Sequence, residues 1–211
     1  DNVSLINNLG AGAINLLNEG DLSIAEVAAL SGDIFITSQQ GQLTVETLTS
    51  TGDVTLATIS TGANADIRLG AINTGSGVLN LNSANSVLQF NSTTNARLNI
   101  GELNLTVAGD FGATSEAINT LSQIEISGNV GGDFYLNADD VSTITNLQTN
   151  SISQGVVVID AANEFNVDLL EAQNASSLSI QGRIRQGVSV FFVLKAFIRF
   201  ALGPIPRPRA A

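Results

Sequence analysis

The strongest constraint on the fold is an eight-residue pattern that recurs along the chain. It begins with Gly-Asp or Ala-Asp and carries apolar residues at its third, fifth and eighth positions, as in G-D-V-T-L-A-T-I (52–59) and A-D-I-R-L-G-A-I (65–72). Related octets start at Gly20, Gly32 and Gly132, and the last two lack the final apolar residue. One unit of this size cannot bury its own apolar face, so the repetition predicts units stacked in a solenoid.

Each octet is interpreted as a strand that follows a turn. Apolar residues at alternate positions place one face of a strand against a core, so Val54 and Leu56 are expected to point inward and Thr55 outward. The leading glycine suits a tight turn, and the aspartate beside it can hydrogen-bond to its own backbone. Ala25–Leu30 also matches one helical turn, but it overlaps an octet and is interpreted as strand.

The alternation continues to about residue 182 and identifies the expected core. Strand starts recur at roughly 10–13 residue intervals, so two of them would form one coil of about 20–25 residues. The following residues are expected to point inward: Val3, Leu5, Ile14, Leu16, Leu22, Ile24, Ile34, Ile36, Leu43, Val45, Leu48, Val54, Leu56, Ile59, Leu69, Leu79, Leu81, Leu88, Phe90, Leu98, Ile100, Leu103, Leu105, Val107, Ile124, Ile126, Phe134, Leu136, Val156, Val158, Phe165, Val167, Leu169, Leu178 and Ile180.

Three further expectations follow from the same pattern. Arg68 and Asn80, like Thr55, should face solvent. Val141, Ile144 and Leu147 stand three residues apart, a spacing that also suits a helical turn. The stretch 108–120 fits the pattern least and is expected to bulge from the stack as a loop.

The residue types support a filled, narrow β core. The chain has no Trp, Met, Cys or His, one Tyr, and only 13% charged residues, and its three prolines lie beyond residue 203. The absence of cysteine excludes a disulfide framework and thiol chemistry. The chain begins at Asp1 without Met or a signal segment, so we interpret it as a mature piece or a fragment.

The charges divide the chain near Gln181–Gly182. All 19 acidic residues lie at or before Glu171, and the only basic residues of 1–182 are Arg68 and Arg97, which gives a net charge of −17. Residues 183–211 contain six basic residues and no acidic one. We therefore expect β-solenoid repeats over 1–182 and a separate basic, apolar segment over 183–211.

Three interpretations of the segment 183–211 remain open. A transmembrane anchor is disfavoured, because Val188–Leu202 is shorter than the ~20 apolar residues that a bilayer needs and contains Lys195 and Arg199. A short amphipathic helix could cap the last coil with Phe192, Ala196 and Phe200, and would end at Gly203-Pro204. A foreign or out-of-frame tail would explain why acidity and repeats end together.

The repeats G-D-V-T-L-A-T-I-S-T-G, A-D-I-R-L-G-A-I-N-T-G-S-G and S-G-D-I-F-I-T-S resemble those of the filamentous haemagglutinin-like surface proteins of bacteria. The likeness covers about 20–182 and is strongest at 31–83. It implies a right-handed parallel β-helix that is secreted by a two-partner route and has an adhesive or spacer role. The secretion domain of that family is not evident in 1–31.

Some β-helices are enzymes that act on acidic polysaccharides, and Asp139-Asp140 faintly resembles their paired acids. The hydrolases of that group also use a histidine and a basic pair, whereas this chain has no His. A lyase needs an Arg or Lys as the proton-abstracting base, and the repeats offer only Arg68 and Arg97. Serine nucleophiles have no His or Cys partner. We expect a solvated turn at Asp139-Asp140 and no enzymatic activity.

The turn aspartates Asp21, Asp33, Asp53, Asp66 and Asp133 could align in a stack and bind calcium. The simpler interpretation is that each one satisfies its own turn, and we predict no metal or other cofactor site. Nucleic acid is excluded as a partner, because a body of charge −17 repels phosphate.

The sequence therefore predicts a stiff section of a bacterial surface adhesin. The expected location is extracellular, on the cell surface, without membrane insertion of the solenoid body. The expected partner is a glycan or protein on a host or neighbouring cell. A carbohydrate-active β-helix enzyme and a passive scaffold without a ligand are the alternatives.

Overall fold

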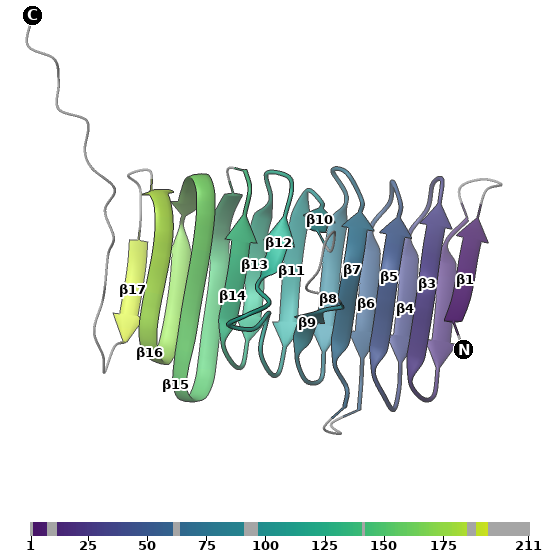
Figure 1. The fold of residues 1–211 in the computed structure, drawn as a ribbon, viewed down its shortest axis with the longest axis horizontal. Coiled ribbons are helices and arrows are strands. Elements are labelled where there is room, and N and C mark those ends of the chain that lie inside the picture. The colour runs from purple at the N-terminus through teal and green to yellow at the C-terminus, as the bar shows by residue number, and fades with distance from the viewer. Residues whose placement is uncertain are drawn as a thin grey trace, which may run out of the picture.

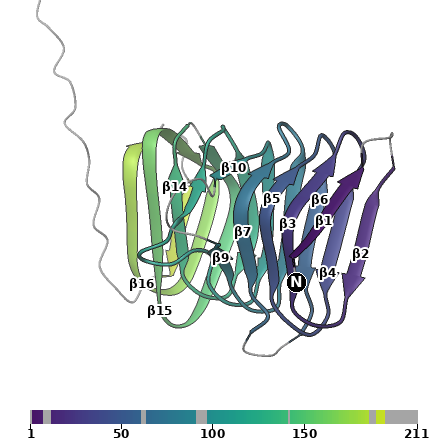
Figure 2. The ribbon, with the colours of Figure 1, turned by 45° about the vertical axis from the view of Figure 1, so that its right-hand side comes forward.

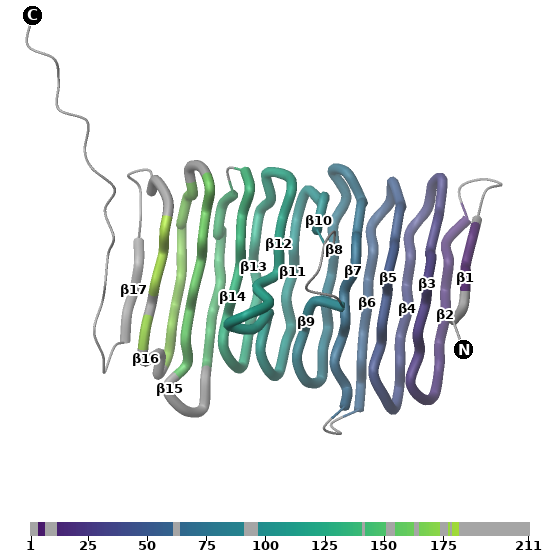
Figure 3. The backbone as a smooth tube through the Cα atoms, viewed as in Figure 1, coloured from purple at the N-terminus to yellow at the C-terminus, as the bar shows by residue number. Residues whose placement is uncertain are grey.

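The computed structural model shows an all-β parallel solenoid of about seven turns, as predicted. It describes residues 2–7, 12–60, 64–90, 97–140, 142–184 and 189–193. All pairings between its strands are parallel. The chain rises along the near side of Figure 1, descends along the far side and advances from right to left, so the coil is right-handed. Figure 3 traces the same path as a tube.

The strands form two layers with the core between them, and Figure 2 shows both layers obliquely. Layer A, on the far side of Figure 1, contains β2 (Ile14–Asn18), β4 (Ile34–Ser38), β6 (Val54–Thr58), β8 (Val78–Ser83), β11 (Glu102–Val107) and β13 (Glu125–Val130). Layer B contains β1 (Asn2–Asn7), β3 (Leu22–Ala29), β5 (Leu43–Thr49), β7 (Ile67–Asn73), β9 (Val87–Gln89), β10 (Arg97–Asn99), β12 (Ile118–Thr120) and β14 (Phe134–Ala138). The longer β15 (Ser142–Val167) and β16 (Leu169–Ile184) pass through both layers, and β17 (Ser189–Val193) pairs with the layer-A part of β16.

The register between coils gives their length. Ile14 pairs with Ile34, and Ile34 pairs with Val54, so these two coils are each 20 residues long. The next step, from Val54 to Leu79, takes 25 residues, and the shortest, from Ile126 to Ile144, takes 18. The coil length deduced from strand spacing is thus close to the observed one. Insertions are accommodated in the turns, because the strands must keep their ladder.

Most of the predicted core residues are buried. Ile36, Val45, Leu56 and Leu81 have no exposed surface, and Leu69 is 1% exposed. Thr55, Arg68 and Asn80 lie on the outer face of their strands, where they are half-buried. The other buried residues of the prediction are Leu22, Ile24, Ile34, Leu43, Leu48, Val54, Leu79, Leu98, Ile100, Leu103, Leu105, Val107, Ile124, Ile126, Phe134, Leu136, Phe165, Val167 and Ile180.

Some predicted positions are only partly buried or lie outside the described region. Leu5, Ile14 and Leu16 pack against the core but keep partial exposure in the first coil. Leu169 is half-buried, and its neighbour Leu170 occupies the core instead. Val141 and the side chains of Val3 and Leu178 lie outside the described part of the chain. Ile144 and Leu147 are buried on a strand, so their spacing of three does not reflect a helix.

The prediction that Leu88 and Phe90 point inward is wrong. Leu88 is half-buried and Phe90 is 39% exposed, whereas Val87 and Gln89 face the core. Strand β9 follows the register of β7, in which Ile67 pairs with Val87 and Leu69 with Gln89. The buried Gln89 side chain donates a hydrogen bond to the carbonyl of Ala117. The backbone pairing with β7 therefore sets the register of β9, although it places the polar Gln89 inside and the apolar Phe90 outside.

The prediction that Val156 and Val158 point inward is also wrong. Phe134 pairs with Val157 and Leu136 with Ile159, so Val157 and Ile159 are buried while Val156 and Val158 are half-buried. The run V-V-V-I contains four apolar residues in succession. Such a run has no alternation from which the inward face could be read.

The last apolar residue of the octet has different environments in the two layers. In β3, β5 and β7 the pairing omits the fourth residue and the alternation shifts by one, so that Val27, Leu48 and Ile72 are buried. Layer-A strand β6 ends at Thr58, and Ile59 is 59% exposed. The prediction of an inward Ile59 is therefore wrong, because the layer-A octet has no such shift.

The glycine that opens the octet is required by the neighbouring coil. A Cβ on Gly52 would lie 2.6 Å from the carbonyl oxygen of Gly32 in the preceding coil. Among the leading glycines of the octets, only Gly32 adopts a positive φ, of 107°. The expectation that glycine mainly serves a tight turn thus holds at one position, and close packing of coils explains Gly52.

The stretch 108–120 leaves the stack only briefly. Phe111 is fully buried in layer B, where it bridges Val87 and Phe134, and its ring stacks on Phe134 with centroids 5.0 Å apart. Strand β12 then returns to the ladder at Ile118. Only the short turn between them, closed by an antiparallel bridge from Ala113 to Glu116, departs from the coil. The predicted loop is real but much shorter than expected.

The C-terminal segment continues the solenoid where it is described. Strand β16 runs to Ile184, and Ser189–Val193 form β17 instead of the first turn of a helix. Phe192 thus belongs to a strand, whereas Ala196 and Phe200 lie outside the described residues. The proposed helical cap over 188–202 is absent from the described part of that segment.

Candidate functional site

The predicted turn aspartates connect one coil to the next. Each stands at a corner, which we define as the residue immediately before a strand or before Phe111. Its Oδ1 accepts the backbone N–H of the residue that occupies the equivalent position in the following coil. The pairs are Asp21 with Gln42 (2.8 Å), Asp33 with Asp53 (3.1 Å), Asp53 with Val78 (3.0 Å), Asp66 with Ser86 (3.1 Å), Asp110 with Asp133 (2.7 Å) and Asp133 with Val156 (2.8 Å). The carboxylates thus serve the neighbouring coil rather than their own turn.

These aspartates belong to two separate rows. Asp33 and Asp53 precede layer-A strands, whereas Asp21, Asp66 and Asp133 precede layer-B strands. No group of three or more potential metal ligands of the His, Cys, Asp and Glu types is present in the described part of the chain. The turn aspartates that could align to bind calcium therefore form two short, separate rows.

Asp110 is a member of the layer-B row that the sequence analysis missed. Its carboxylate accepts from Asp133 N, and its own N–H donates to Ser86 Oγ at 3.0 Å. The signal was the dipeptide Gly109-Asp110 followed by an aromatic residue. It went unrecognised because the stretch after it breaks the alternation.

A second set of polar residues forms ladders along the outer faces. On layer A, hydrogen bonds link Asn80 to Thr55 (3.4 Å), Asn104 to Asn80 (3.2 Å) and Ser127 to Asn104 (2.6 Å). On layer B, Asn99 donates to Asn73 and Asn137 donates to Asn119, each at 3.0 Å. Side chains at equivalent positions of stacked coils lie about 4.8 Å apart, so amides and hydroxyls can bond along the axis.

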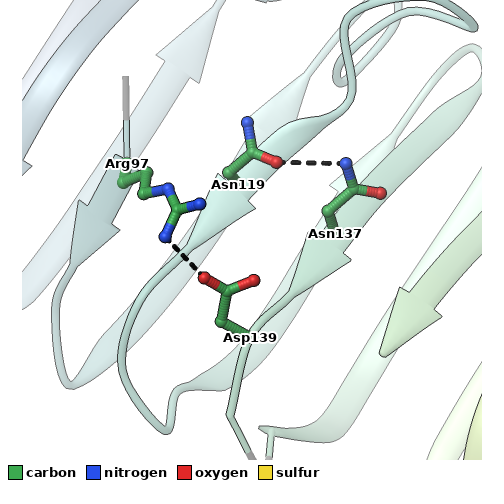
Figure 4. A network of polar contacts seen from close by, with 4 residues as sticks. All are labelled: Arg97, Asn119, Asn137 and Asp139. Atoms are coloured by element: carbon green, nitrogen blue, oxygen red, sulfur yellow. Dashed lines mark hydrogen bonds and ion pairs between the residues drawn. The ribbon is translucent and has the colours of Figure 1, made fainter. Parts of the chain in front are cut away.

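Asp139 takes part in an ion pair on layer B, beside one of these amide pairs (Figure 4). Its Oδ2 lies 2.6 Å from Arg97 Nη1, and the two side chains are 43% and 44% exposed. A pair this exposed contributes at most about 1 kcal/mol to stability. Asp140 is exposed in the turn that follows. Asp139 therefore meets a cation, and the two acids stand at the surface as predicted for a solvated turn.

A shallow surface recess lies beside this ion pair. It has a volume of about 200 Å³ and lies over β5, β7 and β10. Most of the surface that lines it is apolar, and a few hydrogen-bonding groups stand beside that surface. The lining residues are Thr47, Leu48, Thr49, Ala71, Ile72, Asn73, Arg97, Asn99 and Leu121. Arg68, which lies on β7, does not line the recess.

Tyr135 forms a largely buried polar cluster. The residue is 7% exposed, and its hydroxyl lies 3.1 Å from Thr114 Oγ1 and 3.2 Å from Asp133 Oδ2. Burial raises the pKa of the Tyr135 phenol above 10.0, and the negative charge of Asp133 acts in the same direction, while the hydrogen bond from Thr114 opposes it. The cluster anchors the short turn that follows Phe111.

Comparison of the chain with protein-family models, with curated proteins and with solved structures finds no match. Among the described residues, no helix is long and apolar enough to span a bilayer. The resemblance to haemagglutinin-like repeats thus depends on the repeat pattern and on the solenoid fold.

The corner bonds can be tested by substitution at Asp53. Replacement by Ala removes the acceptor for the N–H of Val78, and we expect the free energy of unfolding to fall by roughly 0.5–1.5 kcal/mol. Asp53→Asn keeps the Oδ1 acceptor and serves as the matched control. Urea unfolding followed by circular dichroism measures both, and an Asn variant as unstable as the Ala variant would contradict an acceptor role.

The single tyrosine makes the pH dependence directly measurable. The absorbance of tyrosinate in the folded chain should titrate with a midpoint above 10.0, and the midpoint should return to about 10 in urea. Because the folded state holds the proton more tightly, stability is retained below pH 10 and falls as the pH rises through the pKa of the folded state. Asp133→Asn should lower the midpoint; an unchanged midpoint would mean that Asp133 has no influence on the phenol.

Proposed function

We propose that this chain is a section of a secreted bacterial surface adhesin, a stiff rod that mediates attachment to a host or neighbouring cell. The observation that carries the proposal is the uninterrupted parallel stack, in which a single core extends from Leu22 to Ile180. A shape of this kind extends steadily as coils are added. It suits a protein whose task is to reach outward from a cell.

Three kinds of contact stiffen the rod against bending. Backbone ladders join every described coil to the next, aliphatic side chains fill the space between the layers, and corner carboxylates bridge successive turns. Bending would have to stretch the ladders on one side and compress the core on the other. Packed interiors resist such compression.

The outer face supports the adhesive part of the proposal. It presents rows of amides and hydroxyls along the axis, together with the recess beside Arg97. Groups of this type can donate and accept hydrogen bonds to the hydroxyls of a glycan or to a protein backbone. The partner is therefore proposed to be a surface glycan or protein in the extracellular space.

We propose a binding role rather than catalysis. The chain has no His or Cys to act as a base or thiol nucleophile. The acid that was considered for hydrolysis, Asp139, lies in an ion pair with Arg97. A binding surface needs neither a perturbed acid nor a general base, so these residues suit adhesion better than polysaccharide cleavage.

The rod can be shortened by one coil through deletion of residues 34–53. Ile14 would then face Val54, and Leu22 would face Ile67, in the register that each now keeps with the deleted coil. We expect a folded chain that is shorter by about 4.8 Å, measured by circular dichroism and small-angle X-ray scattering. Deletion of 34–43 removes half a coil and should unfold the region; equal tolerance of both deletions would contradict the coil register.

Adhesion is tested by applying the full chain to arrays of glycans and extracellular proteins. The proposal predicts saturable binding to a defined class of ligand, and Arg97→Gln should weaken it if the recess contributes. Arg68→Gln, on the outer face away from the recess, is the matched control. Absence of binding on either array would favour a passive scaffold, and calcium-dependent release of sugar fragments would favour an enzyme.

A further inference from the structure

Two columns of side chains run along the outer face of layer A, parallel to the axis of the solenoid. The backbone register aligns them from β4 to the layer-A part of β15. The first column is Phe35, Thr55, Asn80, Asn104, Ser127 and Asn146. The second column is Thr37, Ala57, Asn82, Thr106, Asn129 and Gln148. All of these side chains except Phe35 and Ala57 end in an amide or a hydroxyl group.

Neither column contains a charged residue. Acidic side chains stand along one edge of this face, at or just before the first residue of their strands: Asp33, Asp53, Glu102 and Glu125. The strands of layer B carry charged residues within them, among them Glu26, Glu46, Arg68 and Arg97. On layer A, neutral groups are thus bordered by negative ones. This arrangement favours a neutral ligand and disfavours an acidic one.

The two columns differ in the state of their polar groups. In the first column, Asn104 donates to Asn80 and Asn80 donates to Thr55, and all three side chains are half-buried. In the second column, Asn82 and Thr106 are exposed. Bonds within the first column hold its amides in place, which reduces the entropy lost on binding. The exposed groups beside them can donate to and accept from the hydroxyls of a ligand.

Phe35 adds an aromatic surface to the first column. Its ring is 42% exposed, and its register partner in the next coil is Thr55. The face of an aromatic ring is apolar and electron-rich. A sugar ring has C–H groups on its faces and hydroxyls around its edge, so it can pack on Phe35 while its hydroxyls bond to neighbouring polar side chains.

The face is regular over several coils. The pairings from β4 through β6, β8 and β11 to β13 contain no register shift, whereas those between β3, β5 and β7 omit a residue. Successive coils are about 4.8 Å apart, so each column spans about 24 Å. A linear polymer with repeating hydroxyls can therefore contact several coils at once.

The same face is poorly suited to a protein partner. Protein interfaces are usually centred on large apolar and aromatic side chains, and Phe35 is the only such side chain in the two columns. The ladder pairs β6, β8 and β11 on both sides, so these strands have no open edge for an added strand.

We infer that the outer face of layer A binds a neutral, extended polysaccharide that lies along the axis of the solenoid. The inference rests on the proposed adhesive function, because it names the ligand class that the rod recognises. It assigns that ligand to a separate surface, since the recess beside Arg97 lies over strands of layer B.

Affinity electrophoresis of the full chain tests the ligand class. The gels contain a linear neutral polysaccharide (β-glucan, xylan or mannan) or an acidic one (alginate or hyaluronate). We expect at least one neutral polymer to retard the chain equally at low and high ionic strength, because no charge on the ligand is screened. Affinity for its oligosaccharides should increase with length until they cover about 24 Å.

Retardation by acidic polymers alone, or by none of the polymers, would overturn the inference. The arrays of glycans and extracellular proteins then separate the two proposals. Binding to a protein or to an acidic glycan would leave the adhesive function standing and remove only the ligand class. Absence of binding on every array would remove both.

Phe35→Ala tests the aromatic contact. It should weaken binding of the neutral polysaccharide by about fivefold or more. Phe90→Ala is the matched control, because Phe90 is 39% exposed and follows β9 in layer B. Thermal unfolding of both variants checks that the fold is kept. Equal losses of affinity in the two variants would contradict the assignment to layer A.

Asn82→Ala tests the polar columns. Loss of one hydrogen bond to the ligand should weaken binding by about twofold to tenfold. Gln40→Ala removes an exposed amide from the turn between β4 and β5 and should leave the affinity unchanged. If Arg97→Gln abolishes binding while Phe35→Ala and Asn82→Ala have no effect, the ligand occupies the recess and the inferred site is wrong.

Discussion

The structure depends on the parallel hydrogen-bond ladder that holds each coil in register with the next. A parallel strand that slips by one residue turns its whole inward face outward, so the ladder and the core must agree. The corner residues help to maintain this agreement. Gly52 lets the preceding backbone approach closely, and the Asp53 carboxylate accepts the N–H of Val78 in the following coil. The Gly-Asp pair therefore acts between coils as well as within a turn.

The ladder also takes precedence over side-chain hydrophobicity where the two conflict. Gln89 is buried while Phe90 is exposed, because β9 must match the register of β7. The buried amide is tolerated since it donates to the carbonyl of Ala117. A buried polar group that keeps a hydrogen bond costs far less than an unpaired one. The short turn after Phe111 thus compensates for a polar residue in the core.

The same regularity shapes the surface on which the proposed functions depend. Equivalent outward positions repeat once per coil, so Asn80 and Asn104 bond to each other along the axis. The polar faces of the rod are thereby available for ligands, and the proposed receptor contacts use them.

The fold class, the coil length and most of the core are predictable from the octet, because it combines apolar alternation with a Gly-Asp corner, and both act locally. Ile36, Leu56 and Leu81 are buried as predicted for this reason. The layer that each octet occupies depends on how the coils stack, and this layer explains why Ile72 is buried while Ile59 is exposed. Likewise, the run V-V-V-I carries no alternation, and its inward face depends on Phe134 and Leu136 in the adjacent coil. The partners of the corner carboxylates and of Arg97 lie 20 or more residues away, at distances along the chain that vary with the turns, so coil stacking alone brings them together.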